Sequence, residues 1–392
     1  MNVILFDNPE IRKNLLPLTY TRPVAGIRAG ILTIKEKWDL WLKTSCSYYT
    51  QAYLSDKFKL VEKENSLFIS SQICPDKKIT EAVNSLRPGQ ALFKNNNLIA
   101  FIGSSENIKN QGSLNKVEIT FPLFEINNVW DIFQKNGEAL LSDFEILTSG
   151  KESQSISSTV VIIGDKNLVF FEKGAKAEAC ILNTTGGPIY IGKEAEIMEG
   201  SAIRGPFALC EHSSLKLNSK IYGPTTVGPH CKIGGEINNC VIFGYSNKAH
   251  DGFIGNSVIG EWCNLGADSN SSNLKNNYGN VKLFNYAKNK SVDTGLQFCG
   301  LIMGDYSKSG INTMFNTGTV VGVGANVFGG GFPVTFIPDF SWGSSQGFQT
   351  YKQDKLFETT AKVFERRGLK FGDAEKRILN EVFRLTAEYR ND

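Results

Sequence analysis

The stretch "IGKEAEIMEGSAIRGPFALCEHSSLKLNSKIYGPTTVGPHCKI", residues 191–233, decides the fold of this chain. An aliphatic residue recurs at every sixth position: Ile191, Ile197, Ile203, Leu209, Leu215, Ile221, Val227 and Ile233. A mostly small residue follows four positions after nearly every one: Ala195, Ser201, Phe207, Ser213, Ser219, Thr225 and Cys231. A period of six is neither the 3.6 of an amphipathic helix nor the 2 of a half-buried strand.

This period fits a prism in which each face is one short strand and the chain turns a corner every six residues. The aliphatic side chain then points into the narrow interior, and the small residue lets the backbone bend. Coils stack at about 4.8 Å, strand on strand, so neighbouring coils must resemble each other. The repeat therefore predicts a left-handed parallel β-helix built from hexapeptide repeats.

The repeat resumes at Ile254, Ile259 and Leu265, and again at Val321 and Val327. Residues 268–295 between these two segments are polar and lose the period, which predicts a loop that leaves the prism. Loops on a rigid scaffold are frequent sites of function.

The chain outside the repeat reads differently. Short apolar runs at 2–6, 66–70 and 97–103 predict strands, and helical spacing recurs at 34–43, 78–86 and 129–147. This alternation predicts an α/β domain over residues 1–150 with a Rossmann-like fold. The β-helix is expected over 151–345, and the last segment, 346–392, predicts a tail of two charged amphipathic helices.

Composition excludes several classes of protein. The net charge of +3 over 392 residues, without a basic run, argues against nucleic acid as a partner. No run of about 18 apolar residues exists, which argues against a membrane span. The start lacks a signal peptide, so we expect a cytoplasmic protein. Eight scattered cysteines indicate buried free thiols, with a zinc site or a disulfide frame as the minority alternative.

The segment "VIFGYSNKAHDGFIGNSVIGEWCNLGADSNSSNL", residues 241–274, is similar to a motif of known enzymes. That motif reads H-L-x-Y-x-G-D-x-x-I-G-x-x-x-N-x-G-A-G-T-x-x-x-N. With the domain order, it gives a resemblance to the GlmU-like bifunctional sugar-1-phosphate nucleotidyltransferase/acetyltransferases. "WDIF" in the first domain and "FIPDFSWG" near the end of the β-helix resemble a branch of that family with a reduced first domain.

The resemblance implies roles for four residues. His250 would be the general base that takes a proton from the amine of the sugar, Asn264 and Phe253 would contact the amino sugar, and Asn273 would lie at acetyl-CoA. A histidine titrates near neutral pH, as such a base must, and amides can donate to an oxyanion. The alternative for His250 is an ordinary surface residue at a corner. "GPFALCEHS", residues 205–213, lacks the arginines with which the family binds a sugar phosphate.

The first domain departs further from the family pattern. "VILF" is followed by no glycine-rich loop, Val24 stands where the family has a lysine in "LLPLTYTRPV", and "LFISSQICP" holds no carboxylate. Candidate phosphate ligands are Arg12, Arg22 and Arg28, for which surface or salt-bridge roles are the alternative. Asp131, with Asn128, is the candidate for a metal ligand, and Mg²⁺ is expected only if this domain is active.

The function expected from the resemblance is acetyl-CoA-dependent N-acetylation of an amino-sugar phosphate or sugar nucleotide by a homotrimer, with acetyl-CoA as co-substrate. One alternative is an active sugar-1-phosphate nucleotidyltransferase using UTP or dTTP. The other is a non-catalytic trimer that senses sugar nucleotides or acts as a scaffold. The identity of the sugar, the base and the pathway is not specified by the sequence.

Overall fold

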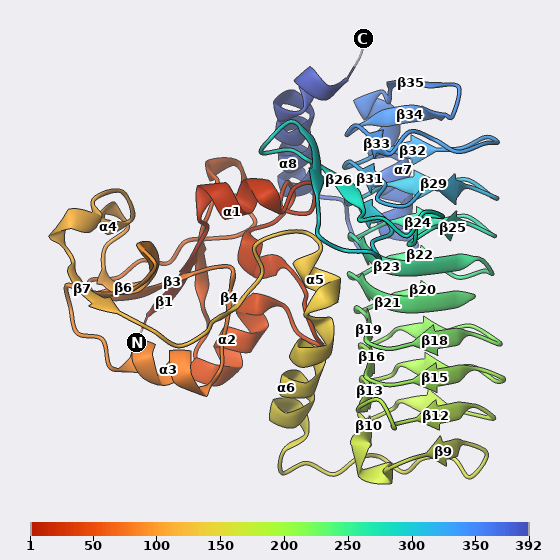
Figure 1. The fold of residues 1–392 in the computed structure, drawn as a ribbon, viewed down its shortest axis with the longest axis horizontal. Coiled ribbons are helices and arrows are strands. Elements are labelled where there is room, and N and C mark those ends of the chain that lie inside the picture. Colours follow the sequence, from red (N-terminus) through yellow and green to blue (C-terminus); the bar gives the residue numbers. More distant parts are fainter. Residues whose placement is uncertain (1, 391–392) are drawn as a thin grey trace. The chain divides into compact units, whose positions relative to one another are not determined.

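A computed structural model describes residues 2–390 and divides the chain into two compact units. The first unit runs to Asn128, except for the short segments Leu16–Leu18 and Arg28–Ile31, which group with the second unit. The second unit continues from Val129 to the end of the chain. Each unit has its own sheets, labelled in Figure 1.

The first unit is built on a six-stranded mixed sheet in the order β2-β1-β3-β6-β5-β7. Strand β1 pairs in parallel with both β2 and β3, and β6 runs antiparallel to β3 and β5. All four residues of β1 are buried, as is typical of a strand covered on both faces. Its strands are β1 (Val3–Phe6), β2 (Ser47–Tyr49), β3 (Ser66–Ser70), β5 (Gln90–Lys94), β6 (Asn97–Gly103) and β7 (Asn115–Glu118).

Four helices and a small second sheet complete this unit. The helices are α1 (Pro9–Asn14), α2 (Ile34–Leu42), α3 (Lys77–Asn84) and α4 (Glu106–Lys109), and the second sheet pairs β4 (Ile73–Cys74) with β8 (Phe124–Glu125). Helix α1 begins directly after β1, because Asn8 caps it with its side chain and Pro9 stands in the first turn. The predicted alternation of strands and helices is confirmed.

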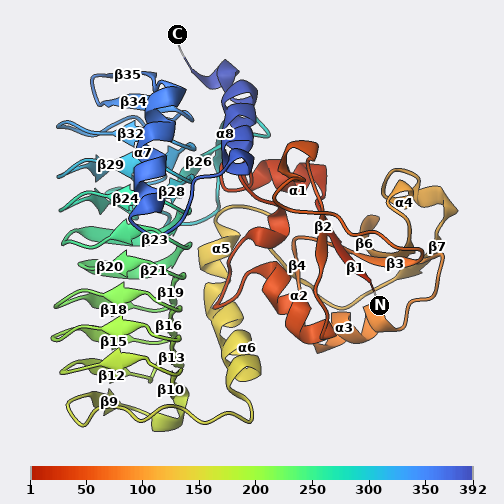
Figure 2. The same cartoon turned by 180° about the vertical axis from the view of Figure 1, so that it is seen from behind.

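The second unit is a left-handed parallel β-helix, as predicted. Its coils rise as a regular ladder from β9 to β34 in Figures 1 and 2. Face 1 consists of β9 (Val161–Ile163), β12 (Ile181–Asn183), β15 (Ala202–Arg204), β18 (Lys220–Tyr222), the first halves of β21 (Glu236–Ile242) and β23 (Phe253–Ile259), β25 (Asn270–Ser271) and β30 (Met314–Phe315).

The other two faces complete each coil. Face 2 consists of β10 (Val169–Phe171), β13 (Ile189–Ile191), β16 (Phe207–Leu209), β19 (Thr225–Val227), the second halves of β21 and β23, β28 (Ile302–Met303), β31 (Val320–Val321) and β33 (Phe336–Ile337). Face 3 consists of β11 (Lys176–Ala177), β14 (Glu196–Ile197), β17 (Ser214–Leu215), β20 (Lys232–Ile233), β22 (Asn247–Lys248), β24 (Asn264–Leu265), β29 (Lys308–Ser309), β32 (Asn326–Val327) and β34 (Ser341–Ser344), which β35 (Gly347–Thr350) extends as a hairpin.

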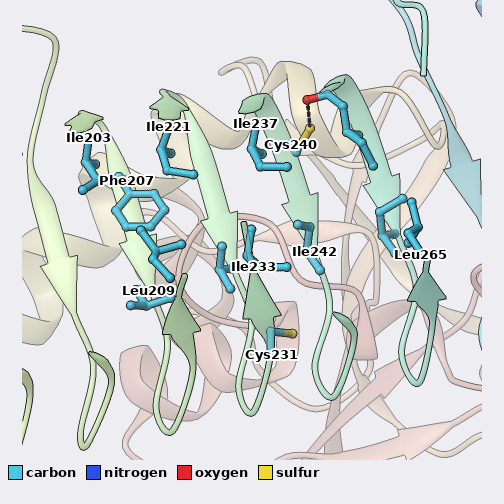
Figure 3. Close-up of a cluster of buried hydrophobic side chains, with 14 of the residues drawn as sticks. Ile203, Phe207, Leu209, Ile221, Cys231, Ile233, Ile237, Cys240, Ile242 and Leu265 are labelled. Atoms are coloured by element: carbon cyan, nitrogen blue, oxygen red, sulfur yellow. Dashed lines mark hydrogen bonds between the residues drawn. The ribbon is translucent and has the colours of Figure 1, made fainter. Parts of the chain in front are cut away.

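The interior of the prism is the core that the six-residue period predicts. All eight aliphatic positions from Ile191 to Ile233 are at most 1% exposed. Figure 3 shows several of them stacked from coil to coil. Burying such a side chain is worth roughly 1.5–3 kcal/mol, so the repeat itself supplies the driving force for the fold. All eight cysteines are free and buried, which confirms that prediction.

Segments outside the coils pack on the prism. Helices α5 (Asp131–Gln134) and α6 (Asn136–Thr148) contact face 2. The polar segment predicted as a loop contains the hairpin β26 (Lys282–Asn285) with β27 (Lys290–Asp293). The tail forms α7 (Gln353–Glu365) and α8 (Asp373–Leu385), so the two predicted helices are confirmed. Within residues 2–390, no helix combines the length and the apolar character that crossing a membrane requires.

Candidate functional site

An open groove of about 800 Å³ lies along the corner where face 3 turns into face 1. Its lining residues are Met198, Lys216, Leu217, Gly235, Ala249, His250, Asp251, Ala267 and Asp268. One coil has a short corner at this groove. Only Gly234 and Gly235 separate β20 from β21, whereas four residues separate β22 from β23 in the next coil.

Gly235 shows how tightly this corner is packed. Its φ is +77°, and a Cβ atom there would lie 2.6 Å from the carbonyl oxygen of Gly252 and 3.0 Å from that of His250. A side chain at Gly235 would therefore clash with the backbone of the coil that carries His250. Glycine is required both by the backbone angle and by this close approach.

His250 lies at the rim of this groove. It follows β22 in a bend, its side chain is exposed, and the next residue, Asp251, is exposed as well. In the part of the chain that the structure describes, the imidazole makes no hydrogen bond, ion pair or ring contact. Both ring nitrogens are thus accessible to a ligand in the groove.

The other two histidines have a different environment. His212 and His230 stack at 4.9 Å between ring centroids, and His230 stacks on Tyr245 at 4.6 Å. The stack continues through Trp262 to Phe364 of α7. His212, His230, Tyr245 and Trp262 all have φ between 55° and 62°, so equivalent corner positions of successive coils place their rings face to face.

Phe253 and Asn273 come together on face 1. A Cβ atom at Gly255 would lie 2.7 Å from the Phe253 ring and 2.5 Å from the Asn273 amide, so both side chains lie over this glycine. The Asn273 amide also donates to Oδ1 of Asn256 at 2.8 Å. Asn264 is elsewhere: it projects from face 3, exposed, beside Asn247 of the neighbouring strand. Of the four residues, the groove of one chain contains only His250.

A second hollow, of about 420 Å³, lies in the first unit. It opens where the parallel strands β1 and β2 end, and Asp7 and Thr50 follow those strands directly. Asn96, Asn97 and Lys109 contribute polar groups from the opposite side. The carboxyl ends of parallel strands are where α/β sheets bind ligands.

Asp7 is already bound by protein groups in this hollow. Its carboxylate accepts from the Val24 amide at 3.0 Å and from the Thr50 hydroxyl at 2.5 Å, and Arg12 lies 3.7 Å away. Burial raises the pKa of Asp7 although these donors and Arg12 oppose the shift. Val24, which replaces the expected lysine, contributes its backbone N–H here instead of a side-chain charge.

The three candidate phosphate ligands are all buried. Arg12 is 7% exposed and donates to the Thr19 carbonyl and the Tyr53 hydroxyl. Arg22 is buried in the first unit, and Arg28 donates to the Ile31 carbonyl within the second. None of them lines the hollow. Their phosphate role stays a prediction.

The role of Asp131 as a metal ligand stays a prediction. Asp131 is buried as the first residue of α5. Across residues 2–390, no group of three or more histidine, cysteine, aspartate or glutamate side chains is arranged to hold a metal ion.

Residues 3–152 match the family model described as sugar nucleotidyl transferase. The resemblance to bifunctional nucleotidyltransferase/acetyltransferases is confirmed by curated relatives. A bifunctional sugar-1-phosphate nucleotidylyltransferase/acetyltransferase of Sulfurisphaera tokodaii is 30% identical over 166 residues, which cover 42% of this chain and 40% of the relative.

A second relative is the bifunctional protein GlmU of Methanococcus maripaludis, 27% identical over 219 residues, which cover 55% of this chain and 46% of the relative. The chain thus spans less than half the length of either relative. Among solved structures, the UDP-N-acetylglucosamine acyltransferase of Francisella novicida aligns with 60% of this chain and 78% of its own, at 14% identity and a TM-score of 0.36.

Sequence reasoning missed two residues at the groove. Gly235 lies in a corner of two residues, where the next coil has four. Lys248 occupies an interior position two residues before His250. The interrupted period between Ile233 and Ile254 was the signal for both. A break in a repeat marks a coil of altered length.

Proposed function

We propose that this protein is an acetyl-CoA-dependent N-acetyltransferase that acts on an amino sugar carrying a phosphate or a nucleotide. The observation that carries the proposal is the place of His250: an imidazole without a partner in the described structure, at the rim of a groove beside a short corner. The curated relatives, named as acetyltransferases, support the same reaction.

The chemistry needs one base and one leaving thiol. The amine of the sugar attacks the thioester carbonyl, so a C–N bond forms and the C–S bond breaks. His250 takes the proton that the amine loses and returns it to the departing thiolate of coenzyme A. Such proton transfer is the usual role of histidine in catalysis near neutral pH. Asn264 would place the acceptor, with Phe253 against the sugar ring and Asn273 at the thioester.

We propose that the site is completed in a homotrimer. His250, the pair of Phe253 with Asn273, and Asn264 occupy three different parts of one β-helix, so one chain alone does not gather them. The corner that carries His250 also exposes large apolar side chains: Leu217 is 59% exposed and Ile311 69%.

The test is a screen of amino-sugar phosphates and amino-sugar nucleotides with acetyl-CoA, followed by release of free thiol. The expected result is turnover with a subset of acceptors and none with the matching N-acetylated sugars, which lack a free amine. Absence of thiol release with every acceptor, from a folded protein that binds acetyl-CoA, would reject the reaction.

A second activity is favoured by the hollow in the first unit. Its position at the ends of β1 and β2 and the family match support binding of a sugar nucleotide there. We infer that pyrophosphorylase activity is weak, because the sequence lacks together the glycine-rich loop after "VILF", the lysine that Val24 replaces and a carboxylate in "LFISSQICP". Release of pyrophosphate from UTP, dTTP, CTP, ATP and GTP with sugar-1-phosphates and magnesium tests this, and robust turnover with any pair would show that other residues replace them.

A further inference from the structure

Lys248 occupies a position inside the β-helix where the repeat calls for an aliphatic residue. It pairs with Ile233 across β22 and β20, and the inward positions on either side are Leu215, Ile233 and Leu265. Lys248 itself is 2% exposed. A buried ammonium loses its hydration, and this costs several kcal/mol unless donors and charge are well satisfied.

The Lys248 ammonium forms hydrogen bonds with the corner that carries His250. It donates to the carbonyl oxygen of His250 in a short hydrogen bond and to that of Asp251 at 2.6 Å. Burial lowers the pKa of Lys248 to about 8, while the carboxylates of Asp251 and Asp268 oppose this shift. The charge is thus held by two backbone carbonyls and by two acidic side chains of the groove.

The neighbouring coil shows what Lys248 replaces. There, Gly266, which the strand register aligns with Ala249, accepts a backbone hydrogen bond from Ser269 at 3.2 Å that closes the turn, whereas no backbone N–H of the described chain donates to the Ala249 carbonyl. In the described chain, no backbone N–H donates to the His250 carbonyl, and the Asp251 carbonyl accepts one bond, from Asp268 at 3.0 Å. The corner of His250 therefore has no backbone hydrogen bond that closes its turn. Instead, the Lys248 ammonium links the carbonyl oxygens of His250 and Asp251 from the interior of the β-helix.

We propose that Lys248 is a positioning residue for His250: it fixes the two carbonyls of the corner and so sets the direction of the imidazole at the groove. The expected effect on kcat rests on the proposed acetyl transfer, whereas the expected effect on the direction of the His250 side chain does not. It explains why a charge is kept in an apolar interior. Replacing a buried charge by an apolar side chain is often neutral or stabilising, so stability alone does not account for it.

The experiment uses Lys248→Met in the 392-residue chain, because methionine fills a similar volume without a donor. Leu215→Met is the matched control, an interior substitution on the same face that touches no corner carbonyl. The chain has only three histidines, so each imidazole signal in an NMR spectrum can be assigned with single substitutions. The readouts are these signals, the free energy of unfolding, and kcat and KM for acetyl transfer.

Three results are expected for Lys248→Met. The His250 signal shifts and broadens while those of His212 and His230 stay. Unfolding free energy is equal to or higher than that of the wild type. The kcat falls by about 100-fold, the effect of misplacing a catalytic group by roughly 1 Å, with little change in KM for acetyl-CoA. Leu215→Met should leave the His250 signal and kcat unchanged.

An unchanged His250 signal in Lys248→Met, or equal changes in all three histidines, would overturn the inference. If the methionine variant does not fold, Lys248→Gln, which keeps one donor, decides the question by the same spectrum. If the wild type transfers no acetyl group, the proposed function fails, whereas the NMR comparison still tests the link between Lys248 and His250. A kcat within about 2-fold of wild type together with a shifted signal would overturn the positioning role, because misplacement should cost more.

Discussion

Gly235 and Lys248 act on His250 from two sides. Gly235 keeps the shortened corner free of atoms that would collide with the backbone at His250 and Gly252. Lys248 holds the carbonyls of His250 and Asp251 from the interior. The His250 side chain is exposed and makes no hydrogen bond, ion pair or ring contact with the described residues, so its direction is set by the backbone of its corner. Single substitutions at this scale should therefore separate stability from activity.

Gly235→Ala should destabilise the protein more than Gly295→Ala. Both glycines have positive φ, +77° and +72°, so alanine at either costs about 1–2 kcal/mol of backbone strain. Only at Gly235 does the new Cβ meet backbone, which adds roughly 1–3 kcal/mol. Denaturant unfolding of the two variants measures the difference; equal losses would mean that the corner relaxes without cost.

Of these residues, the sequence predicts His250 through its motif but not Lys248. The motif fixes spacing along the chain, and His250 was its only histidine. Whether a residue points inward depends on its position in the repeat. The short corner at Gly234–Gly235 shifts the positions of the residues that follow it. Asn264 and Asn273 carry the expected spacing too, yet the coil places them on different faces, which spacing alone does not indicate.

At the scale of elements, the ring stack joins the tail to the β-helix. Trp262 and Phe364 stack at 3.9 Å between centroids, and Arg367 donates to Asn247 at 3.0 Å. The period of six predicts every coil, but the stack arises from the corner residues between faces, whose φ is positive. Helix α7 contacts the last ring of this row through Phe364, and the amphipathic pattern of the tail does not predict this contact.

Phe364→Ala should release α7 from the prism. Phe364 is 5% exposed, and removing a buried phenylalanine costs about 3–5 kcal/mol. We expect trypsin to cleave faster after Arg366 and Arg367, which stand at the end of α7. Phe357→Ala, at a half-buried ring of the same helix, is the control with a smaller effect. Equal cleavage rates in both variants would show that the stack does not hold the tail.

Asp339 should make stability depend on pH. It is fully buried, accepts from the Tyr286 hydroxyl at 2.8 Å and the Val323 amide at 2.6 Å, and burial raises its pKa to about 6. Because the pKa of Asp339 is higher in the folded than in the unfolded chain, the protonated carboxyl stabilises the fold at a pH below the pKa of the unfolded chain. This stabilisation is lost as the pH rises through about 6. Relative to Asp339→Asn, the wild type should lose about 2 kcal/mol of unfolding free energy between pH 4 and pH 7. Parallel pH profiles of the two proteins would contradict this.

At the scale of the whole molecule, the order of α/β unit, β-helix and helical tail follows from composition and period, because each architecture has its own spacing of apolar residues. Assembly does not follow from the same signals. The apolar side chains exposed along the corner of His250 favour association of copies through that edge. The proposed shared site is not predictable in the same way, because spacing along one chain does not indicate how residues of several copies would come together.

Light scattering in solution should therefore report three times the 43.3 kDa of one chain. Leu217→Asp and Ile311→Asp together place charges on the exposed corner and should dissociate the assembly, because a buried unpaired charge costs several kcal/mol. Lys282→Asp, at an exposed position on the hairpin, is the matched control. A wild type that is monomeric at micromolar concentration would remove the shared site.

The central claim, that His250 is the base of an acetyl transfer, is tested most directly by the rate of thiol release in His250→Ala. His212→Ala serves as the control, because it removes an imidazole from the ring stack. The account predicts that His250→Ala keeps its fold and assembly while kcat/KM on the true acceptor falls by roughly 100- to 10,000-fold, and that His212→Ala retains most of the rate. Near-normal turnover by His250→Ala would contradict it.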